Sequence, residues 1–312
     1  LTLSLVLEEI AAGDGGTSTA IGVTNCPVNA ILMQHGNAQQ QAQWLTPLAQ
    51  GRMLGAFCLT EPQVGSDASA LKTTAQREGD AYVLNGVKQF ITSGQNGDVA
   101  IVIAMTDKAA GKKGMSAFLV PTNAPGYVVA RLEEKLGQHS SDTAQINLDN
   151  CRIPVENRIG AEGEGYRIAL GALEGGRIGI ASQSIGMARS AFEVAVAYAK
   201  ERESFGRPIF EHQAVGFRLA DCATRIEAAR QLTWHAASLR DAGRPCLKEA
   251  AMAKLFASEM AEQVCSAAIQ TLGGYGYVND FPVERIYRDV RVCQIYEGTS
   301  DVQKILIQRA LA

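Results

Sequence analysis

The chain has 312 residues, of which 46% are apolar and 20% charged, and it carries a net charge of −3. This composition is typical of a globular protein with a large buried core, and the length predicts two or three domains. The slight negative charge gives no general electrostatic basis for binding nucleic acid, although a local basic patch stays possible. No apolar run approaches the roughly 20 residues that cross a bilayer, so we expect no membrane span.

The cysteines and histidines argue against a disulfide framework and against a metal site. Seven cysteines are scattered without a CxxC pair, which is typical of buried thiols in a reducing compartment. The four histidines show no HExxH motif and no paired spacing, so no metal site is expected.

The chain begins at Leu1 inside an apolar, helix-like stretch that ends near Gly13. We therefore expect it to be N-terminally truncated, in which case a targeting segment upstream would not be visible. The remainder of the first 55 residues predicts further helices after the Gly13-Asp14-Gly15-Gly16 turn, including one from about Ala38 to Ala49 that ends at Gly51.

From Gly55 the hydrophobic period changes to that of strands. Asn85-Gly86 is the strongest hairpin signal in the sequence and predicts a turn between strands at 82–84 and 87–92. Further strands are predicted at 99–105, 116–120, 127–130 and 144–148. This spacing predicts a compact, β-barrel-like domain.

From about Gly165 the pattern is helical. Apolar residues at spacings of four and three form one stripe: Val215, Leu219, Cys222, Ile226 and Ala229. Helices over 166–202, 212–242 and 247–272, with a short one ending near 310, predict a four-helix bundle. The predicted fold class is multi-domain α+β, with an incomplete N-terminal helical domain (1–55), a middle β-domain (56–160) and a C-terminal helical bundle (161–312).

One stretch near the C-terminus, Gln294-Ile295-Tyr296-Glu297-Gly298-Thr299-Ser300, places a carboxylate just before a predicted helix. Ser300 and Gln303 have the spacing of a capping box. A glutamate held outside a helix N-terminus, next to apolar residues, suits proton abstraction. Burial can raise its pKa toward working pH, and the helix end can stabilise a nearby oxyanion. Taken alone, such a glutamate is more often a capping or surface residue.

Five other stretches could carry chemistry, although each has an ordinary structural interpretation when taken alone. They are the loop FCLTEPQVGSD (57–67), the strand end FITSG (90–94), Glu174-Gly175-Gly176-Arg177, the segment ERESFG (201–206) with Gln213, and the glycine-rich QTLGGYG (270–276). The loop offers N–H and hydroxyl groups that suit a heteroaromatic or phosphate group. Adjacent glycines in a helical stretch are costly and suggest close packing. The glycines at 160, 163 and 165 have the wrong order for G-x-G-x-x-G, so a Rossmann site is not supported.

In this order and spacing, the motifs resemble those of the acyl-CoA dehydrogenase family along essentially the whole chain. The resemblance is carried by FCLTEPQVGSDA (57–68), NGVKQFITSG (85–94), LEGGRIGIA (173–181), ERESFGRP (201–208), QTLGGYGY (270–277) and IYEGTSDVQ (295–303). The segments GRIGIAS and EAAMAKLFASE are most similar to the short-chain and branched short-chain members. Helices, a β-domain and helices in that order are also the family's architecture.

The resemblance implies an enzyme of fatty acid β-oxidation that dehydrogenates an acyl-CoA thioester to a trans-2-enoyl-CoA. Glu297 matches the catalytic base, which takes the α-proton while the β-hydrogen passes as hydride to N5 of FAD. The glycine at 176 excludes the position at which some relatives carry the base. The backbone N–H of Glu297 and a flavin ribityl hydroxyl are the family's oxyanion-hole donors, and electron-transfer flavoprotein is the implied acceptor.

The resemblance also implies the ligand contacts. Positions that match FAD contacts are Phe57, Leu59, Thr60, Phe90, Ile91, Thr92 and Thr299. Positions that match contacts to the FAD of a neighbouring subunit, and so imply a homotetramer or at least a dimer, are Arg202, Phe205, Gln213, Gln270, Gly273 and Gly274. Positions that match acyl-CoA contacts are Ser66, Glu174, Arg177 and Gly298. The chain departs from the commoner family residues at Gln63-Val64 (Gly-Ala), Phe90 (Trp) and Glu174 (Asp), and the last departure bears on the substrate contacts.

Three alternatives stay open. An acyl-CoA oxidase would run the same half-reaction with oxygen as the acceptor. A flavin monooxygenase on this scaffold needs no glutamate base, so Glu297 argues against it. A DNA-binding relative would use the fold as a binding module and would present a basic surface. The sequence fixes neither the acyl chain length or branching nor whether the protein works in a bacterial cytoplasm or a mitochondrial matrix.

Overall fold

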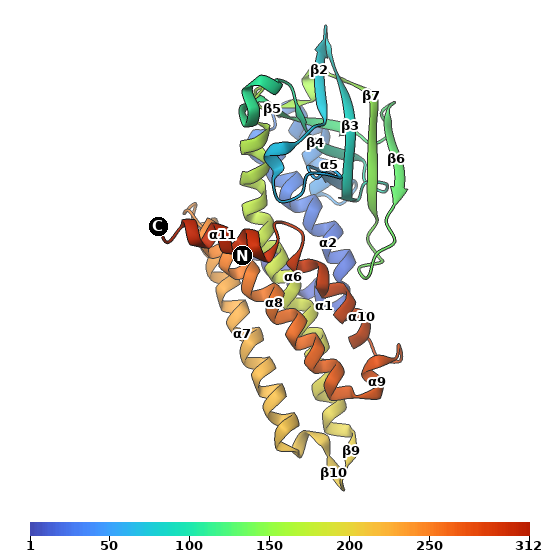
Figure 1. Ribbon diagram of the computed structural model, residues 1–312, viewed down its shortest axis with the longest axis vertical. Coiled ribbons are helices and arrows are strands. Elements are labelled where there is room, and N and C mark those ends of the chain that lie inside the picture. The colour runs from blue at the N-terminus through green and yellow to red at the C-terminus, as the bar shows by residue number, and fades with distance from the viewer. The chain divides into compact units, whose positions relative to one another are not determined.

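The computed structural model describes residues 1–312, which form two compact units (Figure 1). The helical unit comprises residues 1–18, 135–140 and 177–312, and the sheet unit comprises residues 19–134 and 141–176. The long helix α6 (Gly165–Glu201) contributes residues to both units. The division into three domains at residues 55 and 160 stays a prediction.

The sheet unit is built on one eight-stranded sheet. Its strands are β1 (Gly55–Cys58), β2 (Thr74–Glu78), β3 (Ala81–Thr92), β4 (Val99–Met105), β5 (Met115–Pro121), β6 (Tyr127–Leu132), β7 (Thr143–Pro154) and β8 (Arg158–Ile159). They are paired in the order β6-β7-β3-β2-β4-β5-β8, and β1 pairs in parallel with β4. The four strands predicted after β3 are confirmed, and β4 has the predicted bounds.

Strand β4 explains why the sheet unit contains continuous apolar runs. Val99, Ile101 and Ile103 point into a core shared with the helices that precede the sheet, whereas the alternate residues Ala100 and Val102 point into the core on the other face. Because successive side chains of a strand face opposite sides, a strand that is buried on both faces has no polar alternation. The sheet is therefore covered on both faces along this strand.

The helices of the sheet unit that precede the sheet pack on one of its faces (Figure 1). The helical segments are α2 (Gly15–Val23, which begins in the helical unit), η1 (Thr24–Asn29), α3 (Ala30–His35), α4 (Ala38–Gln40), η2 (Gln41–Leu45) and α5 (Thr46–Ala49). The last three follow one another without a break, which confirms the helix predicted from Ala38 to Ala49. Gly51, with φ of +69°, lies just after its end. Three short helical turns, η3 (Ala68–Ala70), η4 (Lys108–Gly114) and η5 (Val155–Asn157), lie between strands.

The hairpin predicted at Asn85-Gly86 is wrong. β3 continues through this pair, and its register against β7 shifts between Leu84 and Gly86. Gly86 has φ of +153°, and a Cβ there would lie 2.8 Å from the Cα of Thr73. Asn-Gly therefore marks a bulge where another backbone approaches closely. The true hairpin joins β2 to β3 through Gly79-Asp80, a two-residue turn that begins with a glycine of φ +63°.

The helical unit contains the predicted long helices. Its elements are α1 (Thr2–Gly13), α6, β9 (Glu203–Ser204), β10 (Arg207–Pro208), η6 (Ile209–Glu211), α7 (Gln213–Asp241), α8 (Leu247–Leu272), α9 (Gly274–Tyr277), α10 (Val283–Val290), η7 (Arg291–Gln294) and α11 (Ser300–Arg309). α8 lies against α7, α10 and α11. The helix predictions at 166–202 and 212–242 are confirmed to within a residue at each end, and that at 247–272 is confirmed as predicted.

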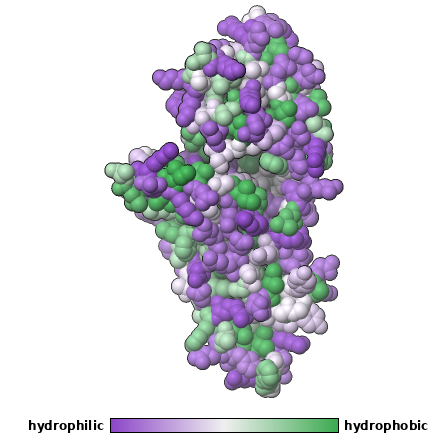
Figure 2. Space-filling view, in the orientation of Figure 1, coloured by the Kyte–Doolittle hydropathy of each residue, from purple (hydrophilic) through white to green (hydrophobic).

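Small side chains allow these helices to pack closely. Fully buried alanines recur at spacings of three, four and seven, which place them on one helix face, along α6 (Ala181, Ala188, Ala191, Ala195, Ala199) and α8 (Ala250, Ala253, Ala257, Ala261). At Gly186 of α6 the backbone of α1 approaches so closely that even an alanine would not fit, because a Cβ there would lie 2.1 Å from the Glu8 carbonyl oxygen. The apolar residues of α11 are less covered: Ile305 is 45% exposed, and hydrophobic side chains gather on this helix in Figure 2. No helix of the structure has the length and apolarity needed to cross a membrane.

Candidate active site

Glu297 lies in a strained turn between η7 and α11 of the helical unit. Its φ is +55°, and Gly298 follows with φ of +88°. A residue with a side chain rarely adopts the left-handed region, and such strain is concentrated at functional sites. Thr299 then begins the helix, because its hydroxyl accepts a hydrogen bond from the Val302 N–H at 3.3 Å. The capping box predicted at Ser300 is wrong: Ser300 already belongs to the helix, and Thr299 caps it alone because Val302, three residues on, has no polar side chain to complete a box.

Two buried side chains hold this turn. The ammonium of Lys254, on α8, donates to the Gly298 carbonyl at 2.7 Å. The amide of Gln303, on α11, donates to the same carbonyl at 2.8 Å and to the Glu297 carbonyl at 3.2 Å. Both side chains are fully buried. The backbone that carries Glu297 is thus fixed from two helices, which defines the place of its carboxyl group.

The carboxyl group of Glu297 is set up to exchange a proton near neutral pH. Its Oε2 is buried and has no hydrogen-bond partner. Burial raises the pKa of Glu297 to about 7, against the opposing effect of the positive charges of Arg177 and Lys254. Burial disfavours the charged form of a carboxyl group, and a base works best with a pKa near working pH.

A polar network anchors the residues next to Glu297. The Tyr296 hydroxyl donates to the Gln183 side chain of α6 at 2.7 Å, and the Gln183 amide donates to the Gly15 carbonyl at 2.6 Å. Gln138 donates to the Tyr296 hydroxyl at 3.4 Å and to the Asp289 carbonyl at 3.2 Å. The segment leading to the turn is therefore tied to elements that are distant in the sequence.

The sheet unit carries a second cluster of predicted residues, at the end of β3. The register of β3 against β7 shifts between Lys88 and Ile91, and Phe90 in this bulge has φ of +59° and is 63% exposed. The Gln89 N–H donates to the Thr60 carbonyl at 2.9 Å, which joins the FCLTEP loop to β3. Thr60 and Thr92 are half-buried. The bulge thus presents an aromatic ring beside a loop with accessible hydroxyl groups, an arrangement that suits a flat heteroaromatic ligand.

A buried ion pair between Lys88 and Glu61 fixes the FCLTEP loop. The Lys88 ammonium donates to the Glu61 carboxylate at 2.9 Å and to the Leu59 carbonyl at 3.2 Å. The same carboxylate accepts from the backbone N–H groups of Lys72 and Thr73 at 2.8 and 2.9 Å. Burial alone would raise the pKa of Glu61, but the Lys88 charge and these hydrogen bonds hold it below its ordinary value. The buried pair thus ties the loop to β3 and to the segment before β2, which is a structural role.

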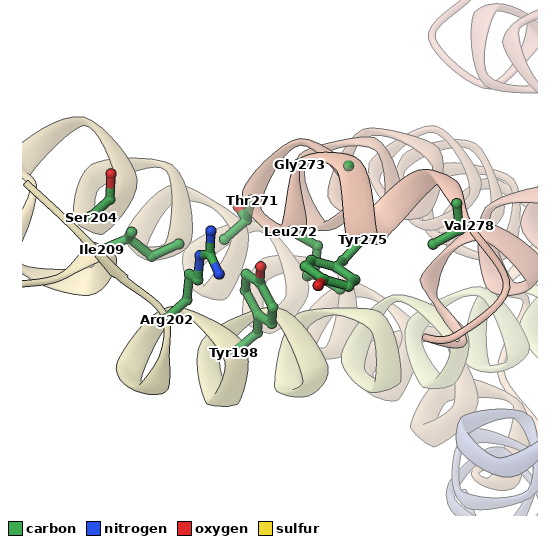
Figure 3. Close-up of a pocket in the computed structure, with 10 residues that line it drawn as sticks. Tyr198, Arg202, Ser204, Ile209, Thr271, Leu272, Gly273, Tyr275 and Val278 are labelled. Atoms are coloured by element: carbon green, nitrogen blue, oxygen red, sulfur yellow. The ribbon is translucent and has the colours of Figure 1, made fainter.

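A pocket of about 560 Å³ lies in the helical unit, where the C-terminal ends of α6 and α8 meet α9 (Figure 3). It is lined by Tyr198, Arg202, Ser204, Ile209, Thr271, Leu272, Gly273, Gly274, Tyr275 and Val278. Figure 3 shows the Arg202 guanidinium extending beside the Tyr198 ring, with Thr271 and Tyr275 close by. An arginine, hydroxyl groups and aromatic rings together suit an anionic ligand with an aromatic part.

The hairpin of β9 and β10 projects next to this pocket. Its turn residues Phe205 and Gly206 have φ of +54° and +77°, as a type I′ turn requires. Phe205 is 95% exposed, and its ring lies at right angles to that of His212, with 6.0 Å between the ring centroids. An aromatic side chain held in a strained turn and presented to solvent is typical of a binding residue.

Three family models together match most of the chain. The acyl-CoA dehydrogenase N-terminal domain matches residues 1–52, the middle domain residues 56–151 and the C-terminal domain residues 163–312. The chain belongs to the acyl-CoA dehydrogenase family. The predicted family, its fold and its class of enzyme are confirmed.

Several members of this family are similar to the chain in both sequence and structure. The mitochondrial short-chain specific acyl-CoA dehydrogenase of Rattus norvegicus is 47% identical over 98% of this chain and 74% of its own. The butyryl-CoA dehydrogenase structure of Megasphaera elsdenii is 42% identical, with a TM-score of 0.97 over 99% of this chain and 81% of that one. A chain in a structure described as the electron transferring flavoprotein of Acidaminococcus fermentans is 47% identical, with the same TM-score and coverage.

The predicted site residues of this acyl-CoA dehydrogenase fall into three local groups. Glu297, Gly298 and Thr299 share one turn with the buried Arg177 acting on it electrostatically. The sheet unit groups Phe57, Leu59, Thr60, Phe90, Ile91 and Thr92 around β1, its loop and the end of β3. The pocket groups Arg202, Gly273 and Gly274. Phe205, Gln213 and Gln270 are exposed and do not line that pocket, Ser66 is exposed on the FCLTEP loop, and Glu174 is half-buried on α6.

Sequence reasoning missed the residues that support these groups. Lys254 was detectable, because a lysine interrupts the stripe of buried alanines on α8. Gln303 was noted as a possible cap, but its amide instead holds the Glu297 turn. Glu61 and Lys88 lie within the family motifs, and nothing in their spacing indicates that they pair.

Proposed function

We propose that this chain dehydrogenates short-chain acyl-CoA thioesters to trans-2-enoyl-CoA, with Glu297 as the base. The observation that carries the proposal is the buried Glu297 carboxyl group, which lacks a hydrogen-bond partner at Oε2 and is held on a strained, doubly anchored turn. The preference for short chains is supported by the relatives, which are named short-chain specific and butyryl-CoA dehydrogenases.

The chemistry of Glu297 follows from what a thioester requires. The α-proton is weakly acidic, so a base must be close in pKa and the developing enolate oxygen must be stabilised. Glu297 takes the α-proton on its carboxylate, and its backbone N–H is the proposed donor to the thioester oxygen. The Cα–H electrons form the new double bond as the β-hydrogen leaves as hydride, so the substrate loses one proton and one hydride.

The acceptor for the hydride is proposed to be FAD, which supplies a two-electron sink when bound. The strained, exposed Phe90 ring with the Thr60 and Thr92 hydroxyl groups fits the flat ring system of a flavin. The other residues proposed to contact FAD on one chain are Phe57, Leu59, Ile91 and Thr299. Residues proposed to contact the FAD of a second copy are Arg202, Phe205, Gln213, Gln270, Gly273 and Gly274, so the working protein would be a homo-oligomer: a homotetramer, or at least a dimer.

The acyl-CoA contacts are proposed at Ser66, Glu174, Arg177 and Gly298. Arg177 is buried near the Glu297 carboxyl group, where its charge favours the carboxylate form. An electron-transfer flavoprotein is the proposed acceptor of the electrons, in keeping with the matching chain from a structure described under that name.

The proposal is tested by mixing the FAD-loaded protein anaerobically with acyl-CoAs from butyryl-CoA to palmitoyl-CoA, straight and branched. Loss of flavin absorbance with formation of the 2-enoyl-CoA is expected, and it should be fastest for butyryl-CoA or another short chain. Reoxidation is then followed with air and with electron-transfer flavoprotein. Fast peroxide formation would indicate an oxidase instead, and a purified protein that binds no FAD or is bleached by no acyl-CoA would overturn the proposal.

A further inference from the structure

Lys254 lies at a place where a charged side chain is unfavourable. It sits on the α8 face that packs into the helical unit, one turn from the fully buried Ala250 and Ala257, and is itself 0% exposed. A lysine is almost never fully buried unless it is paired, because its ammonium group loses its hydration. Burial lowers the pKa of Lys254 to about 8. Its presence in this core therefore needs a specific explanation.

The hydrogen bond that Lys254 makes does not by itself require a charge. Its ammonium donates to the Gly298 carbonyl at 2.7 Å, but the neutral Gln303 amide donates to the same oxygen at 2.8 Å. A carbonyl oxygen with one neutral donor is already satisfied. A second neutral group, or an apolar one, would fill the same space at α8 without the loss of hydration.

The positive charge of Lys254 is explained by the carboxyl group of Glu297, the residue before Gly298. The charged groups that act on Glu297 are Arg177 from α6 and Lys254 from α8. The groups that in turn act on Lys254 are Cys293 of η7, Glu259 of its own helix, and Glu297 and Arg177 themselves. α11 contributes the neutral Gln303. Two cations thus act on a buried carboxyl group that has no hydrogen-bond donor at Oε2.

We propose that Lys254 is a positioning residue for the base: its ammonium holds the Glu297–Gly298 turn through the Gly298 carbonyl, and its charge keeps Glu297 in the carboxylate form. The inference rests on the proposed function of Glu297 and extends it. Gln303 provides the geometric part of this arrangement, whereas Lys254 provides both the geometric and the electrostatic parts.

The two parts can be separated by substitution. Lys254→Gln retains a hydrogen-bond donor but removes the charge, and Lys254→Met removes both. Gln303→Met removes a neutral donor to the same turn and leaves the charges unchanged, so it is the matched control. Because an opposite charge close to a carboxylate lowers its pKa by about one unit or more, loss of the Lys254 charge should make Glu297 harder to ionise.

The experiment measures the rate of flavin reduction by butyryl-CoA across pH, anaerobically and in a single turnover, with FAD content and thermal unfolding recorded for each variant. We expect the midpoint of the wild-type pH profile near 7 to move up by about one pH unit or more in both Lys254 variants. Below the midpoint their rates should fall about tenfold for each pH unit of displacement. Gln303→Met should lower the rate without moving the midpoint.

The inference is overturned if both Lys254 variants keep the wild-type midpoint. It is also overturned if neither forms a folded, FAD-loaded protein, since Lys254 would then be a structural residue of the bundle. Failure of the underlying function looks different. In that case the wild-type protein itself would show no flavin reduction, or Glu297→Gln would react at the wild-type rate, whatever Lys254 does.

Discussion

Replacing Lys254 by methionine should change how the stability of the protein depends on pH. The ordinary pKa of a lysine is 10.5, and burial lowers that of Lys254 to about 8. Between pH 8 and 10.5 the unfolded chain keeps the proton on this side chain while the folded protein releases it. The unfolded state then binds more protons, so the wild-type stability rises with pH across this window. Methionine binds no proton and removes this contribution.

The size of the effect follows from the two pKa values. The fall from 10.5 to about 8 corresponds to about 3 kcal/mol between the two ends of the window. Methionine also removes the hydrogen bond to the Gly298 carbonyl, but the difference in stability between wild type and variant changes with pH only through the proton of Lys254. From pH 7 to 10.5 that difference should therefore move in favour of the wild type by about 3 kcal/mol, or about 6–12 °C in melting temperature for a unit of this size.

The assay is thermal unfolding of the FAD-loaded wild type and Lys254→Met in parallel from pH 7 to 10.5. Groups that titrate equally in both proteins cancel in the difference between the two melting temperatures. The higher Glu297 pKa that we expect in Lys254→Met destabilises the variant further as pH rises, so it adds to the difference in the same direction. Lys304→Met is a suitable control, because the Lys304 side chain is 58% exposed and its replacement should leave that difference constant with pH. If the difference in melting temperature between wild type and Lys254→Met did not change with pH, the reasoning would be refuted. The pKa of Lys254 would then be the same in the folded and the unfolded protein.

Three further predictions follow from the structure. Flavin reduction by wild-type enzyme should rise with pH through about 7, because burial raises the pKa of Glu297 to about 7 and only the carboxylate accepts a proton; stopped-flow rates that do not change from pH 6 to 8 would contradict this. Lys88→Met should lower stability in thermal unfolding by about 3–5 kcal/mol, because it leaves Glu61 buried without its partner, and the double variant with Glu61→Gln should recover part of that loss. Gly186→Val should lower the melting temperature through a clash with a backbone oxygen of α1 that lies 2.1 Å from the added Cβ. Gly171→Ala, which meets nothing within 4 Å, should not, and equal melting temperatures for these two glycine variants would show that α1 and α6 can separate freely.

The fold was predictable wherever the apolar pattern has a single meaning. β4 and α8 have the predicted bounds, because a long apolar run between turn residues indicates a strand buried on both faces and a stripe at spacings of three and four indicates a packed helix. Asn85-Gly86 shows the limit of a local signal. The dipeptide permits a tight turn, but pairing of β3 with β7 on both sides of it is a long-range interaction, and the glycine is used for the close approach of Thr73 instead.

The candidate site shows the same division. Glu297 could be singled out because its neighbours in the sequence define a turn before a helix, and the family resemblance then gave it a role. The groups that set its pKa come from far along the chain: Arg177 lies on α6 and Lys254 on α8. Sequence spacing carries no information about such contacts. The one available sign in the sequence was Lys254 among the alanines of α8. Its role depends on its hydrogen bond to the Gly298 carbonyl, which only the structure shows.

The account is tested most directly by the reaction of Glu297→Gln with butyryl-CoA in the absence of oxygen, followed by the visible absorbance of the bound flavin. Glutamine has nearly the same shape but cannot take up the α-proton. The exposed Glu134 provides the control substitution Glu134→Gln, which should react like wild type. We predict that Glu297→Gln binds FAD normally and loses several orders of magnitude in the rate of flavin reduction. Reduction at a rate close to that of wild type would contradict the assignment of Glu297 as the base.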